Sequence, residues 1–139
     1  MIAAYLRIST STHNQTNDNQ RKRITDAGFQ VEEWFSEEGV SGSVDALDRP
    51  VFSGMMTKLT KGSTVICTHL DRLGRNAVDI VNTIDAFKKM GVGVRVMQLD
   101  GVDLTSSTGL IIVHVMACMA EIEKENIRRN SPEDRQEKR

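Results

Sequence analysis

Aromatic residues are scarce in this chain of 139 residues. They make up 4% of it, with Tyr5 and Trp34 as the single tyrosine and tryptophan, so we expect an aliphatic core rich in methionine. The two cysteines, Cys67 and Cys118, stand in apolar surroundings without a Cys-x-x-Cys motif or a Cys/His metal-ligand spacing. Such cysteines are typical of buried, reduced thiols, which favours a cytoplasmic setting.

The sequence also lacks the marks of secretion and of membrane insertion. Its N-terminus has neither the basic start nor the apolar core of a signal peptide, and its longest apolar run, 110–120, is interrupted by His114 and too short to span a bilayer. The net charge is -1, so a nucleic-acid function would have to rest on local clusters. We expect a soluble protein whose length suits one domain with a core.

Segments typical of strands alternate with segments typical of helices. This alternation predicts an α/β fold with a mostly parallel central sheet flanked by helices. Asp48 is expected to cap the second helix, with Pro50 in its first turn, and the polar segment 37–48 before it reads as a mobile loop. The expected strands are 2–7, 29–35, 64–68 and 92–99, and the expected helices are 15–27, 50–62 and 77–90.

A longer helix is expected from Gly109 to about Asn130. Residues 110–120 make it apolar on every side, and such a helix must be buried all round. In so small a chain we expect another subunit to cover one face, although the helix could also be an internal core element. Pro132 ends the helix. The expected units are therefore an α/β domain over 1–104, the long helix over 105–130 and a disordered tail over 131–139.

Two groups of polar residues follow two of the expected strands. Arg7 and Ser9 stand at the end of the first, and Asp71, Arg72 and Arg75 follow the third. Because the carboxyl ends of parallel strands meet at one edge of a sheet, these groups should converge there. Arginine matches the oxygens of a phosphate and keeps its charge, and serine can supply an oxygen nucleophile. The pattern indicates attack on a phosphodiester.

Each residue also has an ordinary structural interpretation. Ser9 can cap a helix, Asp71 and Arg72 can form a surface ion pair, and Gln20 and Arg49 can face solvent. The charged end of the long helix can be a solvated face. Their joint occurrence favours the phosphate site, whereas no P-loop, G-x-G-x-x-G motif or carboxylate cluster for Mg²⁺ is present in the sequence.

Several short motifs stand in a fixed order: Tyr5-Leu6-Arg7-Ile8-Ser9-Thr10, Gln20, Gly39-Val40-Ser41-Gly42, Asp48-Arg49-Pro50 and Leu70-Asp71-Arg72-Leu73-Gly74-Arg75. Together they closely resemble the catalytic domain of serine recombinases of the resolvase/invertase type. The resemblance runs from residue 2 to about residue 129, and the order and spacing of the Y-x-R-x-S and L-D-R-L-G-R motifs make it highly specific.

The resemblance implies a cut-and-rejoin reaction on DNA that needs no metal or other cofactor. Ser9 matches the nucleophile, which forms a 5′-phosphoserine link and frees a 3′-hydroxyl. Arg7, Arg72 and Arg75 match the arginines around the phosphate, and Asp71 would hold them or assist proton transfer. In free subunits we expect Ser9 to be held away from the arginines.

The resemblance also assigns supporting residues and partners. Gln20 and Arg49 would support the site, although a loop that is mobile without DNA would leave Arg49 without a fixed place. The helix from Gly109 resembles the one through which such subunits dimerise and then form synaptic tetramers, with its exposed end on DNA. No membrane or small-molecule partner is implied. The DNA-binding residues expected on that end are Lys124, Arg128 and Arg129.

This chain departs from the family's pattern at two places. Lys124 stands where the family commonly has arginine, which keeps the charge but loses the forked geometry. Beyond it, Ser131-Pro132-Glu133-Asp134 breaks the expected basic extension, and no helix-turn-helix follows before Arg139. The chain is then either a fragment of a longer recombinase or a short product without sequence-specific targeting.

Two classes of function follow. One is the catalytic domain of a DNA recombinase. The other is a truncated, non-catalytic relative that only pairs with full-length subunits through its apolar helix. A phosphatase or a flavodoxin-like nucleotide-binding protein lacks a supporting glycine-rich phosphate loop.

Overall fold

A five-stranded sheet forms the centre of the molecule in the computed structural model, which describes residues 1–8 and 13–129. The strand order is β2-β1-β3-β4-β5. The first four strands are parallel, and β5 is antiparallel to β4, which confirms the expected mostly parallel α/β fold. The strands are β1 (Ile2–Ile8), β2 (Glu33–Glu38), β3 (Thr64–Cys67), β4 (Gly93–Val96) and β5 (Val102–Asp103).

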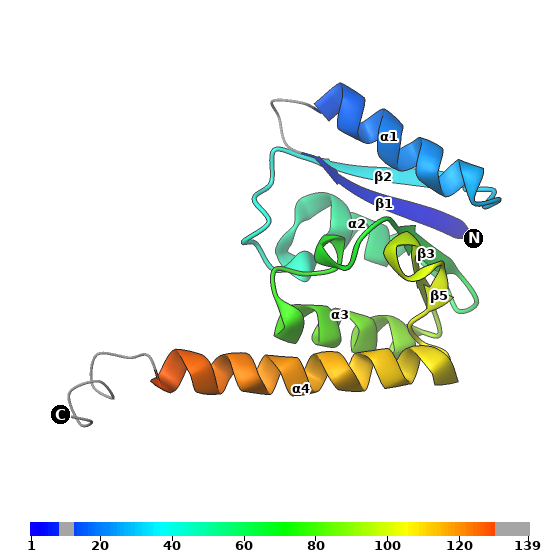
Figure 1. The fold of residues 1–139 in the computed structure, drawn as a ribbon. Coiled ribbons are helices and arrows are strands. Elements are labelled where there is room, and N and C mark those ends of the chain that lie inside the picture. The colour runs from blue at the N-terminus through cyan, green and yellow to red at the C-terminus, as the bar shows by residue number, and fades with distance from the viewer. Residues whose placement is uncertain (9–12, 130–139) are drawn as a thin grey trace.

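Helices cover both faces of this sheet. Figure 1 shows α1 on one face and α2 and α3 on the other, with α4 lying along the outer side of α3. α4 runs antiparallel to α3 and continues past it toward the end of the molecule where β1 and β2 finish. The helices are α1 (His13–Asp26), α2 (Pro50–Lys58), α3 (Ala77–Met90) and α4 (Ser107–Arg129), with short 3₁₀ turns η1 (Ala46–Asp48), η2 (Leu70–Arg72) and η3 (Met97–Leu99).

Local capping signals explain where α3 begins and ends. The side chain of Asn76 accepts a hydrogen bond from the Asp79 amide at 2.9 Å, and Gly91 takes the left-handed conformation at the other end with φ 74°. Both features satisfy backbone groups that a helix leaves without partners at its ends.

The core has a larger and a smaller part, one on each face of the sheet. The larger part is mainly aliphatic, but three of the few aromatic rings meet at its centre: Tyr5 contacts Phe52 at 4.8 Å between ring centroids, and Phe52 contacts Phe87 at 5.8 Å. The smaller part, under α1, contains Leu6 and Ile24.

Two expected strands have different bounds in the structure. The segment 29–35 was expected as a strand, but β2 begins at Glu33 and extends to Glu38. Residues Phe29 and Val31 pack against the smaller core instead, because the chain needs this stretch to return from α1 to the sheet. The expected strand 92–99 ends at Val96, where η3 begins, and the following turn leads into the short strand β5, which the sequence reading did not anticipate.

The start of α4 is pressed tightly against the end of the sheet. Gly109 is buried, and a Cβ atom there would collide with the carbonyl oxygen of Asp103 and the Cα of Leu104. These contacts fix where α4 leaves the sheet.

Substitution of Gly109 tests this close packing. Gly109→Ala is expected to lower the free energy of unfolding by roughly 1–3 kcal/mol, because the added methyl group overpacks a site bounded by backbone atoms. Urea denaturation measures the change. The control is Gly54→Ala in α2, where a Cβ would meet nothing within 4 Å, so alanine should stabilise by about 0.5–1 kcal/mol. If Gly109→Ala also stabilised the chain, the close approach would be wrong.

α4 buries only one of its faces in this chain. Met116 is buried against the larger core, whereas Ile111, Val115, Met119 and Ile122 are 68%, 55%, 52% and 56% exposed. The helix was expected to be buried on all sides, and its own chain covers one side. No helix in the described ranges combines the length and apolar character needed to cross a membrane.

Candidate active site

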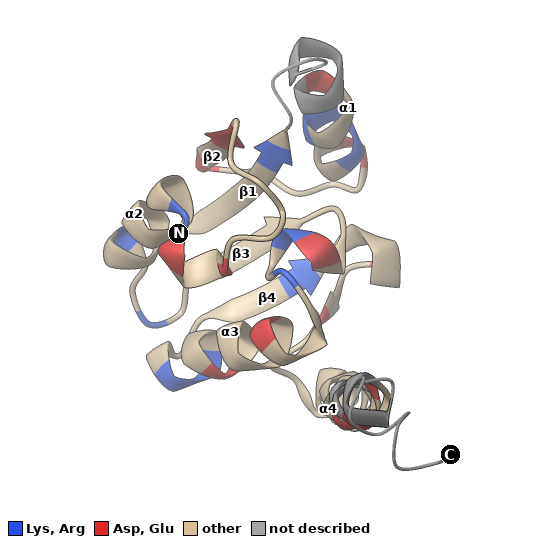
Figure 2. Cartoon of the chain, turned by 90° about the vertical axis from the view of Figure 1, so that its left-hand side faces the viewer, with Lys and Arg blue, Asp and Glu red and all other residues tan. Residues whose placement is uncertain are grey.

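Arg7 lies at the carboxyl edge of the sheet, as the sequence predicts. It is the next-to-last residue of β1, and its Nη1 donates a hydrogen bond to the carbonyl of Val40 at 3.3 Å. The loop after β2 comes close because residue 42 is glycine: a Cβ there would lie 3.2 Å from Arg7 Nη2. In Figure 2 the end of β1 is basic, and α4 is seen nearly end-on, apart from the sheet.

Three arginines converge at this edge. The pKa of Arg7 is lowered, first by burial and then by the positive charges of Arg72 and Arg49. β1 and β3 are neighbours in the sheet, so η2, which follows β3, carries Arg72 to the end of β1. The structure therefore places Arg7 and Arg72 at the same edge of the sheet, with Arg49 as a third member.

Arg49 is the most firmly held of the three. It was expected to lack a fixed place, but it is 0% exposed. Its Nε donates to the carbonyl of Val44 at 3.1 Å, and its Nη1 donates to the carbonyl of Arg72 at 2.8 Å. The expectation was wrong because the guanidinium takes its acceptors from backbone carbonyls on two segments, and it thereby ties the loop after β2 to η2.

Each of these arginines keeps a buried donor without an acceptor. The atoms are Arg7 Nε, Arg49 Nη2 and Arg72 Nε, none of which has a hydrogen-bond partner in the described part of the chain. Asp71 pairs with Arg72 Nη1 at 3.2 Å, but its side chain is 69% exposed. Buried donors without partners are costly, and an anion such as a phosphate would satisfy them. We refer to Arg7, Arg49 and Arg72 as the arginine cluster.

A buried carboxylate beneath the cluster was missed by the sequence reading. Glu37 was expected in a mobile loop, but it lies in β2 and is 2% exposed. It accepts hydrogen bonds from the amides of Val51 and Phe52, both at 3.0 Å, and from the Tyr5 hydroxyl at 3.2 Å. Glu37 therefore caps α2, and the expected cap Asp48 does not: Arg49 occupies the cap position without a side-chain bond.

Tyr5 connects this carboxylate to the cluster. Burial raises the pKa of Tyr5 to about 12, against the opposing polar contact with the Arg49 guanidinium and its positive charge. The hydroxyl therefore stays protonated at neutral pH and remains a donor to Glu37. The sequence held no signal for this placement, because Ser36, Glu37 and Glu38 are all polar and only the structure shows that burial alternates along them.

The other predicted site residues differ in their contacts and in whether the structure describes them. Gln20 is buried in α1, and its Nε2 donates to the carbonyl of Arg7 at 3.4 Å. Arg75 pairs with an acid on the loop after β2, and its Nε lies 2.6 Å from Asp45 Oδ1. Ser9 lies outside the described residues. The same holds for the side chains of Lys124, Arg128 and Arg129, although their backbones belong to α4.

Metal-ligating groups do not gather at this edge. Within residues 1–8 and 13–129, no three side chains of His, Cys, Asp or Glu are close enough together to hold a metal ion. The charge that the site offers comes from its arginines. A mostly parallel sheet with such a cluster at its carboxyl edge is an α/β domain whose edge carries the charge and the donors that suit an anion.

A comparison with known protein families identifies the family of this domain. The family described as "Resolvase, N terminal domain" matches residues 2–139. The chain belongs to this family, which confirms the resemblance drawn from its motifs.

Named recombinases are similar to this chain over most of its length. The serine recombinase PinR of Escherichia coli K12 is 42% identical over 125 residues, covering 89% of this chain and 63% of PinR. The transposon Tn3 resolvase of Escherichia coli is 32% identical over 136 residues, covering 98% of this chain and 70% of that protein. This chain thus spans less than two thirds of the length of PinR.

Solved structures agree with the fold. A resolvase-family site-specific recombinase from Streptococcus pneumoniae has a TM-score of 0.70 and 30% identity, covering 99% of this chain and 98% of that one. The N-terminal catalytic domain of TP901-1 integrase has a TM-score of 0.67 and 26% identity, covering 89% and 96%.

Proposed function

We propose that this chain is the catalytic domain of a serine site-specific DNA recombinase. The observation that carries the proposal is the arginine cluster, in which three buried N–H groups without acceptors surround an edge of the sheet. A phosphate in a DNA backbone supplies the acceptors that these groups lack. Membership in the resolvase family, together with the serine one residue beyond β1, supports the choice of reaction.

The proposed reaction exchanges one phosphodiester for another. The Ser9 oxygen attacks the scissile phosphorus, the bond from phosphorus to the 3′-oxygen breaks, and a 5′-phosphoserine link forms. The serine proton passes to the leaving 3′-oxygen, with Asp71 as the group proposed to assist. The reverse attack by a 3′-hydroxyl rejoins DNA and releases Ser9, so no external energy source is consumed.

The other site residues have distinct proposed roles. Arg7 and Arg72 would bind the non-bridging oxygens, whose charge grows in the transition state. Arg49 would position Arg72 through its bond to the Arg72 carbonyl and offer its free Nη2. Gln20 would steady the end of β1 through the Arg7 carbonyl.

Trapping of a covalent protein–DNA adduct tests this function. The substrate is a random-sequence DNA duplex in which one strand carries 3′-S-phosphorothiolate linkages, because a thiolate leaves readily and rejoins poorly. We expect a band that survives denaturation, with the DNA attached through its 5′-phosphate to the peptide that contains Ser9. Absence of the adduct, or its attachment to another peptide, would contradict the proposal.

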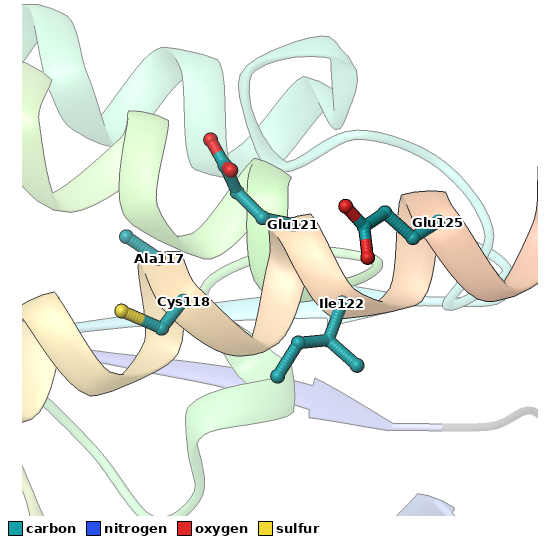
Figure 3. Close-up of a pocket in the computed structure, with 5 residues that line it drawn as sticks. All are labelled: Ala117, Cys118, Glu121, Ile122 and Glu125. Atoms are coloured by element: carbon teal, nitrogen blue, oxygen red, sulfur yellow. The ribbon is translucent and has the colours of Figure 1, made fainter.

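A second function, as an oligomerisation module, is favoured by the exposed side of α4. Ile111, Val115, Met119 and Ile122 follow one another at helical spacing and form one apolar stripe. Figure 3 shows Cys118 and Ile122 pointing to one side of α4, with Glu121 and Glu125 directed away from them. These four residues and Ala117 line a surface groove. The proposed occupant of the stripe is a second copy of this chain, as a dimer or, on synapsed DNA, a tetramer.

The DNA contacts are proposed to extend onto the same helix. α4 continues past α3 at the end of the molecule where β1 carries Arg7 (Figure 1). We propose that its last turns, with Lys124, Arg128 and Arg129, lie on the DNA next to the scissile phosphate.

Aspartates introduced into the apolar stripe of α4 should prevent two copies of the chain from associating. The double variant Val115→Asp and Met119→Asp is expected to shift the chain to a monomer, because pairing would bury carboxylates without partners. Sedimentation velocity measures the change. The control is Leu47→Asp, which alters a 45% exposed apolar residue on η1, outside α4, and should leave association intact. Equal association of the double variant and the parent chain would rule out the stripe as the contact.

The two functions make different predictions. A catalytic domain both associates and forms the adduct. A module that only pairs with full-length subunits associates without forming an adduct on any substrate.

A further inference from the structure

Arg75 has a specific partner outside the arginine cluster. Its Nε lies 2.6 Å from Asp45 Oδ1, and the two side chains are 52% and 44% exposed. Asp45 therefore neutralises Arg75, the second arginine of the L-D-R-L-G-R motif.

The backbones on both sides of this pair are fixed independently of it. Asp79 Oδ2, in the first turn of α3, accepts hydrogen bonds from the Arg75 amide at 2.8 Å and from the Ala46 amide at 3.0 Å. Residue 74 can approach α3 because it is glycine: a Cβ there would lie 2.8 Å from Asp79 Oδ2. Loss of the Asp45 carboxylate would thus free the Arg75 side chain while both backbone segments stay in place.

The contact between the two side chains is mainly one of charge. Asp45 Oδ1 is shielded from solvent but accepts no hydrogen bond of regular geometry in the described part of the chain. Pairs that are half exposed contribute little to stability, so a stronger anion can replace the carboxylate. A phosphate is such an anion, since it offers arginine two oxygens and more negative charge.

We propose that Asp45 is a positioning residue that holds Arg75 in reserve, and that a DNA phosphate displaces it when the chain binds DNA. The proposal rests on the proposed function for its phosphate ligand. Free Arg75 would then be available to the backbone next to the cluster. In the absence of DNA, Asp45 keeps this guanidinium neutralised and lowers the attraction of the edge for other anions.

A double-mutant cycle tests the proposal. Affinity for a short fluorescent DNA duplex is measured by anisotropy at low salt for the full chain and for Asp45→Asn, Arg75→Ala and the double variant. Asp45→Asn is expected to bind about two to five times more tightly, which corresponds to the usual strength of an exposed ion pair. In the Arg75→Ala background the same substitution should bring only the small gain that follows from removing any nearby negative charge.

Asp48→Asn is the matched control for that general charge effect. Asp48 is the last residue of η1, the 3₁₀ turn that Asp45 precedes, and it is exposed. Its substitution by asparagine removes the same charge as the substitution of Asp45. If Asp45→Asn and Asp48→Asn gave equal gains in both backgrounds, Asp45 would have no specific hold on Arg75 and the proposal would be overturned. Asp45→Glu, which keeps the carboxylate, should restore affinity to within about twofold of the parent chain.

A measurement on the unaltered chain tests the proposal even if one of the variants does not fold. The NMR resonance of the Arg75 Nε–H group is expected to shift when the duplex is added, because its acceptor changes from carboxylate to phosphate. An unshifted resonance with saturating DNA would overturn the proposal. If no covalent adduct formed but the double-mutant cycle showed the expected coupling, the recombinase function would be wrong. Asp45 would then still regulate the binding of anions by Arg75.

Discussion

Ser9→Ala is expected to abolish the covalent protein–DNA adduct while DNA binding stays within about twofold of the parent chain. The substitution removes the only atom proposed to attack phosphorus, and loss of a nucleophile costs orders of magnitude in rate. Binding should persist because the charge comes from Arg7, Arg49 and Arg72. Adduct is quantified on denaturing gels with the 3′-S-phosphorothiolate duplex, and affinity by anisotropy with an ordinary duplex.

A neighbouring hydroxyl provides the control. Ser11→Ala removes an equivalent group two residues further along the same Ser/Thr run and should leave adduct formation largely intact. If the two alanine variants lost adduct equally, the run would be needed for local structure and Ser9 would have no special role. Undiminished adduct with Ser9→Ala would assign the nucleophile elsewhere.

Glu37→Ala is expected to give the largest loss of stability in the chain, about 3 kcal/mol or more. It leaves the part-buried amide of Val51, the buried amide of Phe52 and the hydroxyl of Tyr5 without their acceptor. Loss of this helix cap, which is made by the two amides, costs about 1 kcal/mol or more, and the buried Tyr5 hydroxyl left without a partner costs about 1–3 kcal/mol in addition. Such a loss is a large fraction of the roughly 5–15 kcal/mol that stabilises a typical domain. Urea denaturation measures it.

Two variants separate the cap from a general effect of removing an acid. Glu38→Ala changes the next residue, which is exposed, and should alter the free energy of unfolding by less than about 0.5 kcal/mol. Glu37→Gln keeps the shape but replaces one acceptor oxygen by a donor, so its stability should fall between those of the parent chain and the alanine variant. Similar stability of Glu37→Ala and Glu38→Ala would contradict the assigned cap.

The convergence of Arg7 and Arg72 could be predicted because it depends on topology alone. Alternating strands and helices imply a parallel sheet, and a parallel sheet collects the residues that follow its strands at one edge. The bounds of α3 were equally accessible, since Asn76 and Gly91 are local signals that act on their own helix. The order of the elements decides the first case, and residues next to the helix decide the second.

The remaining parts of the site depend on partners far away in the sequence. Arg49 takes its acceptors from Val44 and Arg72, Glu37 caps a helix that begins at residue 50, and Arg75 pairs with Asp45, thirty residues before it. A polar residue read in isolation looks solvated, because the groups that would bury it are not adjacent to it in the chain. The Glu37–Asp48 segment was therefore expected to be a mobile loop, although buried charges hold the chain at Glu37 and at Arg49, directly after the segment.

The antiparallel direction of β5 determines how far the start of α4 lies from the arginine cluster. Because β5 runs back along the sheet, α4 starts at the far end from the arginines and must travel the length of the molecule to return to their side (Figure 1). Its 23 residues measure about 34 Å at the rise of an α-helix. One residue added within it would advance the far end by about 1.5 Å and swing it by about 100°. The length of α4 thus fixes both the position and the rotation of its last turn. It thereby decides which of its side chains face the backbone of a DNA bound at the arginine cluster of the same subunit.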